Sequence, residues 1–286
     1  MLAWPLPFCF AVLWASSYAA AKIGLADITP FAFVAVRLAI AAVAAAAILL
    51  VRQSAWPALA RSWPHLLVGG ALVHGLALAT THAVLTTVGA TSTALVHAIH
   101  PIVTTLVATV TLGEKFRWWQ WLGVALGFFG VVIGVPLSTG TGALLLLALS
   151  LVGLSGGTLY LKRFCPDVPP FEATMVQLVG GALLAGLAAV TLETPHAHWT
   201  LSLVGAMAWN TVLMSIGGMA LYNFMLLHYG ASRAASCFFV VPGAAALIAW
   251  VVLGETLAAL TMIGLVAASL GVALVWWRTK ELPVPG

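Results

Sequence analysis

The stretch that decides the fold is residues 94–114, ALVHAIHPIVTTLVATVTLGE. The same arrangement returns as residues 235–255, ASCFFVVPGAAALIAWVVLGE. In each copy a proline lies near the middle of a long apolar run, and Leu-Gly-Glu ends the run thirteen residues after that proline. The offset of about 141 residues also relates Gly123 to Gly264. We therefore interpret the chain as a duplicated unit of roughly 140 residues.

The composition of the 286-residue chain is that of a membrane protein. Apolar residues make up 63% of it, charged residues only 6%, and the mean hydropathy is +1.11. Such a chain cannot cover a folded surface with polar side chains, so it needs lipid as a solvent. Because the apolar runs are long enough to cross about 30 Å of hydrocarbon and do not alternate like barrel strands, they predict an all-α polytopic protein. The ten candidate spans are residues 4–26, 30–51, 65–88, 90–113, 118–136, 142–163, 170–192, 203–227, 232–253 and 259–277.

The distribution of lysine and arginine predicts which side of the membrane each loop faces. With a cytoplasmic amino terminus, nine of these residues fall in cytoplasmic segments, whereas the outer side holds only Lys22. This excess places both termini in the cytoplasm, and we expect a bacterial inner-membrane location. The basic residues do not cluster on one helix face, so we expect no nucleic-acid partner. The nine are Arg52, Arg61, Lys115, Arg117, Lys162, Arg163, Arg233, Arg278 and Lys280.

The parity of the repeat gives it a direction. A unit of five spans enters the membrane on one side and leaves on the other, so residues 139–286 are expected to lie inverted relative to residues 1–138. In this architecture a substrate site lies near the bilayer midplane between the two repeats. Pro101 and Pro242 lie about midway through their spans and are expected to interrupt those helices. The alternative is a simple kink whose freed carbonyl is satisfied by neighbouring helices.

An ordered set of residues in the first two spans, together with the repeated proline element, resembles a known family. The set consists of Trp14, Ser16, Ser17, Lys22, Pro30 and Arg37. It is similar to EamA-type members of the drug/metabolite transporter superfamily, and the resemblance covers nearly the whole chain. Within the superfamily the chain most resembles bacterial exporters of amino acids, such as the YddG-type aromatic amino-acid exporters. The resemblance implies ten helices, with the first four of each repeat around a central cavity and the fifth peripheral.

Polar side chains at membrane depth are the candidate substrate-binding residues. They are costly in hydrocarbon, so each is a functional candidate, although packing between helices is the alternative. His97 and His100 lie three apart on one helix face, and His82 aligns with Asn223 in the second repeat. We expect these residues to form an aromatic, mostly uncharged cavity that suits an amphipathic small molecule. The predicted lining is Trp14, Tyr18, His74, His82, His97, His100, Tyr160, Tyr222 and Asn223.

Arg37 is a permanent charge well inside a predicted span. Burying it near the membrane centre costs about 3 kcal/mol on insertion scales, so some partner must offset that cost. A substrate carboxylate is one candidate for that partner. A structural contact with Asp27, with helix-end carbonyls or with a lipid phosphate is the alternative. Lys22 lies nearer the membrane surface and has the same two interpretations.

Two further patterns predict contacts between helices. Glu114 and Glu255 lie at helix C-termini, where the helix dipole disfavours a carboxylate. We therefore expect a loop N–H, the N-terminus of another helix or a nearby lysine to hold each of them. Small residues recur at helical spacing in the last span of each repeat and predict close helix packing. These residues are Gly123, Gly127, Gly130, Gly134, Gly264, Ala268 and Gly271.

Together these patterns predict an exporter of small amphipathic metabolites, including aromatic amino acids, that works by alternating access without a cofactor or metal. An exchanger of sugar phosphates or nucleotide sugars is the alternative, although such anions require several cations in the cavity. An intramembrane serine protease is a weaker alternative, based on Ser155 in the G-x-S-x-G pattern of residues 153–157 and on His228. We expect a transporter because that segment is an apolar helix. The absence of a phosphate-binding G-x-x-x-x-G-K-[ST] motif excludes a single-chain ATP-driven pump.

Overall fold

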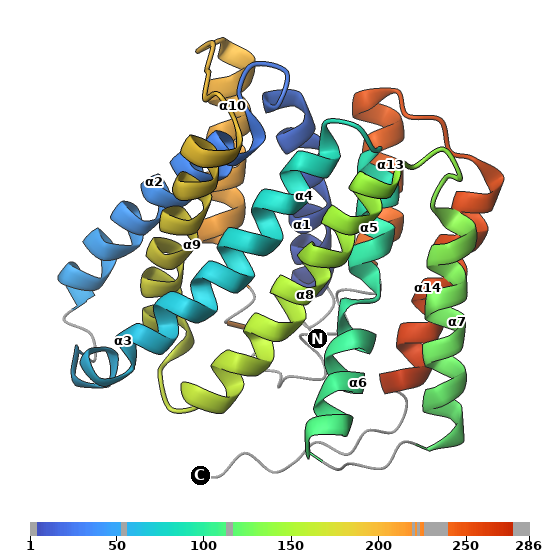
Figure 1. Ribbon diagram of the computed structural model, residues 1–286, viewed down its shortest axis with the longest axis horizontal. Coiled ribbons are helices and arrows are strands. Elements are labelled where there is room, and N and C mark those ends of the chain that lie inside the picture. The colour runs from blue at the N-terminus through green and yellow to red at the C-terminus, as the bar shows by residue number, and fades with distance from the viewer. Residues whose placement is uncertain are drawn as a thin grey trace.

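The computed structural model describes residues 5–52, 56–112, 117–218, 221, 224–225 and 240–276, which form a bundle of helices (Figure 1). Five of the described helical segments are apolar and long enough to cross a membrane, and four shorter ones are apolar as well. Within these residues the β-type pairing is one isolated bridge, between Ile28 and Ala197. The prediction of an all-helical membrane protein is therefore confirmed, whereas the count of ten spans and the inversion stay predictions.

The helices follow one another with short connections. Up to residue 134 they are α1 (Pro5–Gly24), α2 (Pro30–Arg52), α3 (Trp56–Gly70), the π-helix η1 (Ala71–Leu76), α4 (Ala77–Leu85), α5 (Ala90–Ala98), α6 (His100–Leu112) and α7 (Trp118–Gly134). From residue 141 they are α8 (Thr141–Phe164), α9 (Pro170–Leu192), α10 (Leu201–Ala208), the π-helix η2 (Trp209–Gly218), α13 (Val241–Leu253) and α14 (Ala259–Trp276). Because α3, η1 and α4 are continuous, they form one rod, and α10 with η2 forms another.

Local chemistry fixes several helix ends. Helix α2 begins at Pro30, where the missing N–H is not needed. The carboxylate of Glu193, just beyond α9, accepts hydrogen bonds from the backbone N–H groups of Phe31 and Ala32 at 3.3 and 2.8 Å. It therefore satisfies two of the N–H groups that the first turn of a helix leaves unpaired. At the end of α13, Gly254 takes a left-handed conformation with φ of 65°, which glycine adopts without strain.

The two π-helices occupy equivalent positions in the duplicated sequence. Shifting residues 71–76 by the 141-residue offset gives residues 212–217, which lie within η2. A π-helix closes its hydrogen bonds over five residues instead of four, is rare, and is frequent at functional sites. Neither of these elements was predicted from the sequence.

A break between two helices lies beside Pro101, which the sequence predicts to interrupt its span. Helix α5 ends at Ala98 and α6 begins at His100, with Ile99 between them at φ −83° and ψ −2°. Pro242 lies in the first turn of α13, where the backbone N–H that proline lacks would have no partner within the helix. The preceding part of its predicted span, residues 232–239, lies outside the described residues, so an interruption within that span stays a prediction.

Helices α7 and α14 lie side by side at one edge of the bundle (Figure 1). A Cβ atom added at Gly130 would lie 2.5 Å from the carbonyl oxygen of Gly264. One added at Gly271 would lie 2.5 Å from the backbone nitrogen of Gly127. The two backbones approach this closely only because these positions lack side chains, which confirms the predicted packing role of the glycines.

Helix α1 runs through the bundle and packs on α4, α5 and α13 through small side chains. Ala15 and Ala21 of α1 are buried against Ala94 of α5 and Ala245 of α13. Alanine leaves room for closely spaced helices. This packing brings one face of α1, which carries Trp14 and Tyr18, into the middle of the bundle.

Candidate functional site

A cavity of about 280 Å³ lies among α1, α2, η1, α4, α5, α6, α8, α9, η2 and α13. This volume is close to the lower end of ligand pockets, about 300 Å³, so the cavity suits a small ligand. Among its described lining residues no side chain is a carboxylate, and Arg37 is the one permanent cation. The lining residues with polar side chains are Trp14, Ser17, Tyr18, Arg37, His74, Thr81, His82, His97, His100, Thr158 and Ser215.

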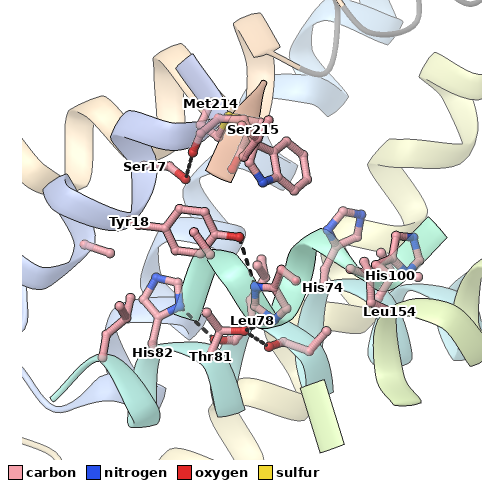
Figure 2. Close-up of a pocket in the computed structure, with 18 of the residues that line it drawn as sticks. Ser17, Tyr18, His74, Leu78, Thr81, His82, His100, Leu154, Met214 and Ser215 are labelled. Atoms are coloured by element: carbon pink, nitrogen blue, oxygen red, sulfur yellow. Dashed lines mark hydrogen bonds between the residues drawn. The ribbon is translucent and has the colours of Figure 1, made fainter. Parts of the chain in front are cut away.

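Seven of the ten predicted binding residues surround this cavity, and Figure 2 shows several of them. They are Trp14, Tyr18, Arg37, His74, His82, His97 and His100. Tyr222 and Asn223 lie outside the described residues. That any of these residues binds substrate stays a prediction.

Tyr160 does not reach the cavity, contrary to the predicted lining. Leu154 and Thr158 of α8 line the cavity because they are four residues apart on one helix face. Tyr160 is rotated by about 200° from Thr158 and points elsewhere. Its hydroxyl lies 2.8 Å from Nδ1 of His65, and its ring packs on Phe164.

A chain of hydrogen bonds fixes Tyr18 and His97 on the cavity wall. The Tyr18 hydroxyl lies 2.9 Å from Nδ1 of His97, and Nε2 of His97 lies 2.8 Å from Ser150 and 3.3 Å from Thr81. Both of these hydroxyls donate their protons to backbone carbonyls, at 2.7 and 2.6 Å, so they can only accept from His97. Nε2 therefore carries the proton, and Nδ1 accepts from Tyr18. His97 is thus a neutral imidazole with both nitrogens occupied.

Arg37 of α2 is 4% exposed and is held by three side chains. Its Nη1 donates to Oδ1 of Asn210 at 2.9 Å and lies 3.3 Å from Nε2 of His82, while Nη2 donates to Ser215 at 3.3 Å. Nδ1 of His82 lies 2.7 Å from the carbonyl oxygen of Leu78, which can only accept. Nδ1 therefore carries the imidazole proton, and Nε2 accepts from Arg37. All three partners of the guanidinium are neutral.

The positive charge of Arg37 consequently has no protein countercharge in the part of the chain that the structure describes. Asp27, an alternative partner in the sequence analysis, instead accepts a hydrogen bond of 2.5 Å from Thr200. Among the described residues, Nε of Arg37 has no hydrogen-bond partner. Neutral hydrogen bonds offset the cost of burying a charge less well than an ion pair does. The guanidinium is therefore an attractive site for an anion in the cavity.

Two other histidines complete the polar wall. His74 lies in η1, and its buried Nε2 has no hydrogen-bond partner among the residues that the structure describes. Buried polar atoms are rarely left unpaired, so this nitrogen is a second place for a ligand contact. Nδ1 of His100 lies 3.0 Å from Oγ of Ser155 and 3.2 Å from Oγ1 of Thr104.

Sequence reasoning missed the residues that hold these groups in place. Asn210 is fully buried in η2 and could have been found, because an amide within an apolar span is as conspicuous as a histidine. Ser150 and Ser215 gave no such signal, since serine is common in membrane helices and usually bonds to its own backbone.

The predicted partners of Glu255 are present at one end of the bundle. Nζ of Lys22 lies 2.8 Å from its carboxylate, which also accepts from the backbone N–H groups of Ala90 and Thr91 at 2.8 and 3.3 Å. Partial burial raises the pKa of Glu255, but the hydrogen bonds from Lys22, Ala90 and Thr91 outweigh it, so the pKa lies below its ordinary value. A lysine and the N-terminus of another helix thus hold Glu255, as predicted. Glu114 lies outside the described residues.

Comparison with known proteins gives consistent matches over most of the chain. The sequence profile of the EamA-like transporter family matches residues 3–135 and again residues 141–277. "Uncharacterized inner membrane transporter YedA" of Escherichia coli (strain K12) is 26% identical over 276 residues, 94% of this chain and 88% of that one. "Uncharacterized transporter YoaV" of Bacillus subtilis (strain 168) is 24% identical over 281 residues, 91% and 92% of the two chains. One crystal structure covers 94% of both chains at a TM-score of 0.64 and 20% identity, which shows a shared fold.

Proposed function

Since the chain belongs to the EamA-like transporter family of the drug/metabolite transporter superfamily, we propose that it exports small amphipathic metabolites. The proposed substrates are amino acids, aromatic ones included, and the proposed mode is alternating access across a bacterial inner membrane. The relative from Escherichia coli is named as an inner membrane transporter, which supports that location.

The observation that carries this proposal is the unneutralised guanidinium of Arg37 on the cavity wall. A ligand carboxylate would supply its missing countercharge through charge-assisted hydrogen bonds. The rest of the wall is apolar, aromatic or hydrogen-bonding, with Trp14 and Tyr18 available to contact an apolar or aromatic side chain. A small carboxylate with an apolar body matches both parts.

We propose further that residues 1–138 and 139–286 form two inverted five-helix repeats, ten spans in all, with both termini in the cytoplasm. The double match of the family profile supports the duplication, as do π-helices at equivalent positions. The excess of basic residues in the cytoplasmic segments supports the orientation. In such transporters the repeats rock about a site near the midplane.

The alternatives have less support. A sugar phosphate or nucleotide sugar carries more negative charge than one guanidinium can neutralise, and the described cavity wall offers no second permanent cation. For a serine protease, Ser155 would need access to a peptide, but it is 3% exposed within α8 and hydrogen bonded to His100. His228, the other residue of that hypothesis, lies outside the described residues.

Counterflow in proteoliposomes tests the proposal. Vesicles containing the purified protein are loaded with one unlabelled compound, and uptake of labelled amino acids, sugar phosphates and cationic dyes is followed. We expect exchange of amino acids, including phenylalanine, and little exchange of the others. Exchange of sugar phosphates without amino acids would contradict the proposal. Repeating the assay with a pH gradient, imposed and then abolished, shows whether protons are coupled to transport.

A further inference from the structure

We propose that Asn210 sets the charge selectivity of the cavity. By holding Arg37 with a neutral amide oxygen, Asn210 leaves the countercharge of the guanidinium to be supplied by the carboxylate of the ligand. This inference rests on the proposed function, in which Arg37 binds that carboxylate. Asn210 itself is absent from the cavity wall, so it acts as a positioning residue.

The orientation of the Asn210 amide follows from its two partners. Nδ2 donates to the carbonyl oxygen of Ala206 at 3.2 Å, and Oδ1 accepts from Nη1 of Arg37 at 2.9 Å. Since a carbonyl only accepts and a guanidinium only donates, the amide cannot be reversed without losing both bonds. The side chain is 0% exposed, so solvent cannot replace either of these hydrogen bonds.

The π-helix η2 brings a second acceptor to the same guanidinium. Ser215 follows Asn210 by five residues, and in an α-helix these positions would point about 140° apart. The wider turn of η2 allows the Ser215 hydroxyl to donate to the backbone carbonyl of Asn210 at 3.1 Å and to accept from Nη2 of Arg37 at 3.3 Å. Both terminal nitrogens of Arg37 are therefore fixed by neutral oxygens from one element, while Nε has no hydrogen-bond partner in the part of the chain that the structure describes.

An aspartate at position 210 would have nearly the same shape as asparagine and would form a buried ion pair with Arg37, but it could not donate to the carbonyl of Ala206. Its negative charge would compensate the positive charge of the guanidinium, which a neutral amide cannot do. It would also neutralise the field that attracts a carboxylate into the cavity. The native asparagine thus keeps both of its hydrogen bonds and leaves the charge of Arg37 available to a ligand.

The test compares charged and neutral substitutions of similar shape in the purified full-length protein. Asn210→Asp is paired with Asn210→Leu, and Ser215→Asp is paired with Ser215→Ala as a second, independent set. Binding of phenylalanine and of phenethylamine, which lacks the carboxylate, is measured by calorimetry, and thermal unfolding is followed in parallel. Phenylalanine and phenethylamine thus report the carboxylate contribution in each variant.

We expect Asn210→Asp to weaken phenylalanine binding by roughly tenfold or more without weakening phenethylamine binding. Its unfolding midpoint reports separately the cost of the lost hydrogen bond to the carbonyl of Ala206. Ser215→Asp should act in the same direction, while the neutral variants, which leave the charge of Arg37 uncompensated, should weaken phenylalanine binding less than the aspartate variants do. Equal losses for Asn210→Asp and Asn210→Leu with both compounds would overturn the inference and leave the role of Arg37 intact. If the wild-type protein bound neither phenylalanine nor another amino acid, the proposed function itself would fail.

Discussion

Lys22 and Arg37 are cations on the first two helices, and they differ in the kind of side chain that contacts them. Lys22 forms an ion pair with Glu255, whose carboxylate also receives N–H groups from the first turn of α5. Arg37 is more deeply buried, at 4% exposure, yet its partners are an amide, an imidazole and a hydroxyl. Within the described residues, the more deeply buried of the two cations is therefore the one that has no carboxylate as a partner.

This difference distinguishes a structural charge, Lys22, from the charge that we propose to be functional, Arg37. The ion pair of Lys22 joins α1, α5 and the end of α13, and within the described residues neither Lys22 nor Glu255 lines the cavity. Arg37 does line the cavity, and its neutral partners orient it without neutralising it. A buried charge of this kind persists where its field has a use, because an apolar side chain or an ion pair would be more stable.

The largest expected effect comes from Arg37→Gln, which copies the residue at the equivalent position of the second repeat, Gln177. We expect counterflow of amino acids to fall by at least about tenfold, because the carboxylate loses its cationic partner. The unfolding midpoint should stay the same or rise, since an unneutralised buried charge is removed. Arg61→Gln, at an exposed position of α3, is the matched control. Normal counterflow by Arg37→Gln would contradict a role for Arg37 in substrate binding.

Glu255→Gln should show the opposite behaviour. It weakens the charge-assisted bonds from Lys22, Ala90 and Thr91, so we expect the free energy of unfolding to fall by about 1–2 kcal/mol. Phenylalanine affinity should be unchanged, because within the described residues Glu255 does not line the cavity. Denaturant titration and calorimetry measure the two quantities. A lower affinity with unchanged stability would show that this end of the bundle also belongs to the binding site.

Lys22→Met should cost less stability than Glu255→Gln. The methionine leaves Glu255 its two backbone donors at the start of α5, so only the partly exposed ion pair is lost. We expect a loss of about 0.5–1 kcal/mol. A double-mutant cycle of the two substitutions isolates the energy of the pair. A larger loss for Lys22→Met would mean that the lysine, through its 3.5 Å contact with the Val88 carbonyl, is the more important partner.

The smallest expected effect is a pH dependence. Because the pKa of Glu255 is lower in the folded protein, its contribution to stability is complete above its ordinary pKa of about 4.5. It is lost as the pH falls through the lowered value. The difference in unfolding free energy between the wild type and Glu255→Gln should therefore be constant from neutral pH down to about 4.5 and shrink below it. If this difference in unfolding free energy persisted in acid, the effect of Glu255→Gln would come from the shape of the side chain and not from its charge.

Much of the cavity could be predicted because polar groups are rare in apolar spans. Tyr18, His82 and His97 were found in this way, without any knowledge of how the helices pack. The prediction for Tyr160 was wrong because the presence of a polar residue within an apolar span indicates its depth in the membrane but not the direction in which its side chain points. The partner of Arg37 was missed because Asn210 lies 173 residues away and faces Arg37 through a π-helix.

By itself the sequence determined that this protein is a helical membrane protein, that its chain carries a repeated pattern, and which few side chains are too polar for lipid. These properties depend on composition and local order, which any stretch of chain reveals. Only the tertiary structure decided that Glu255 neutralises Lys22 and that, within the described residues, Arg37 receives no carboxylate. The residues involved are 233 and 173 positions apart, so their pairing depends on the packing of helices and not on local propensity.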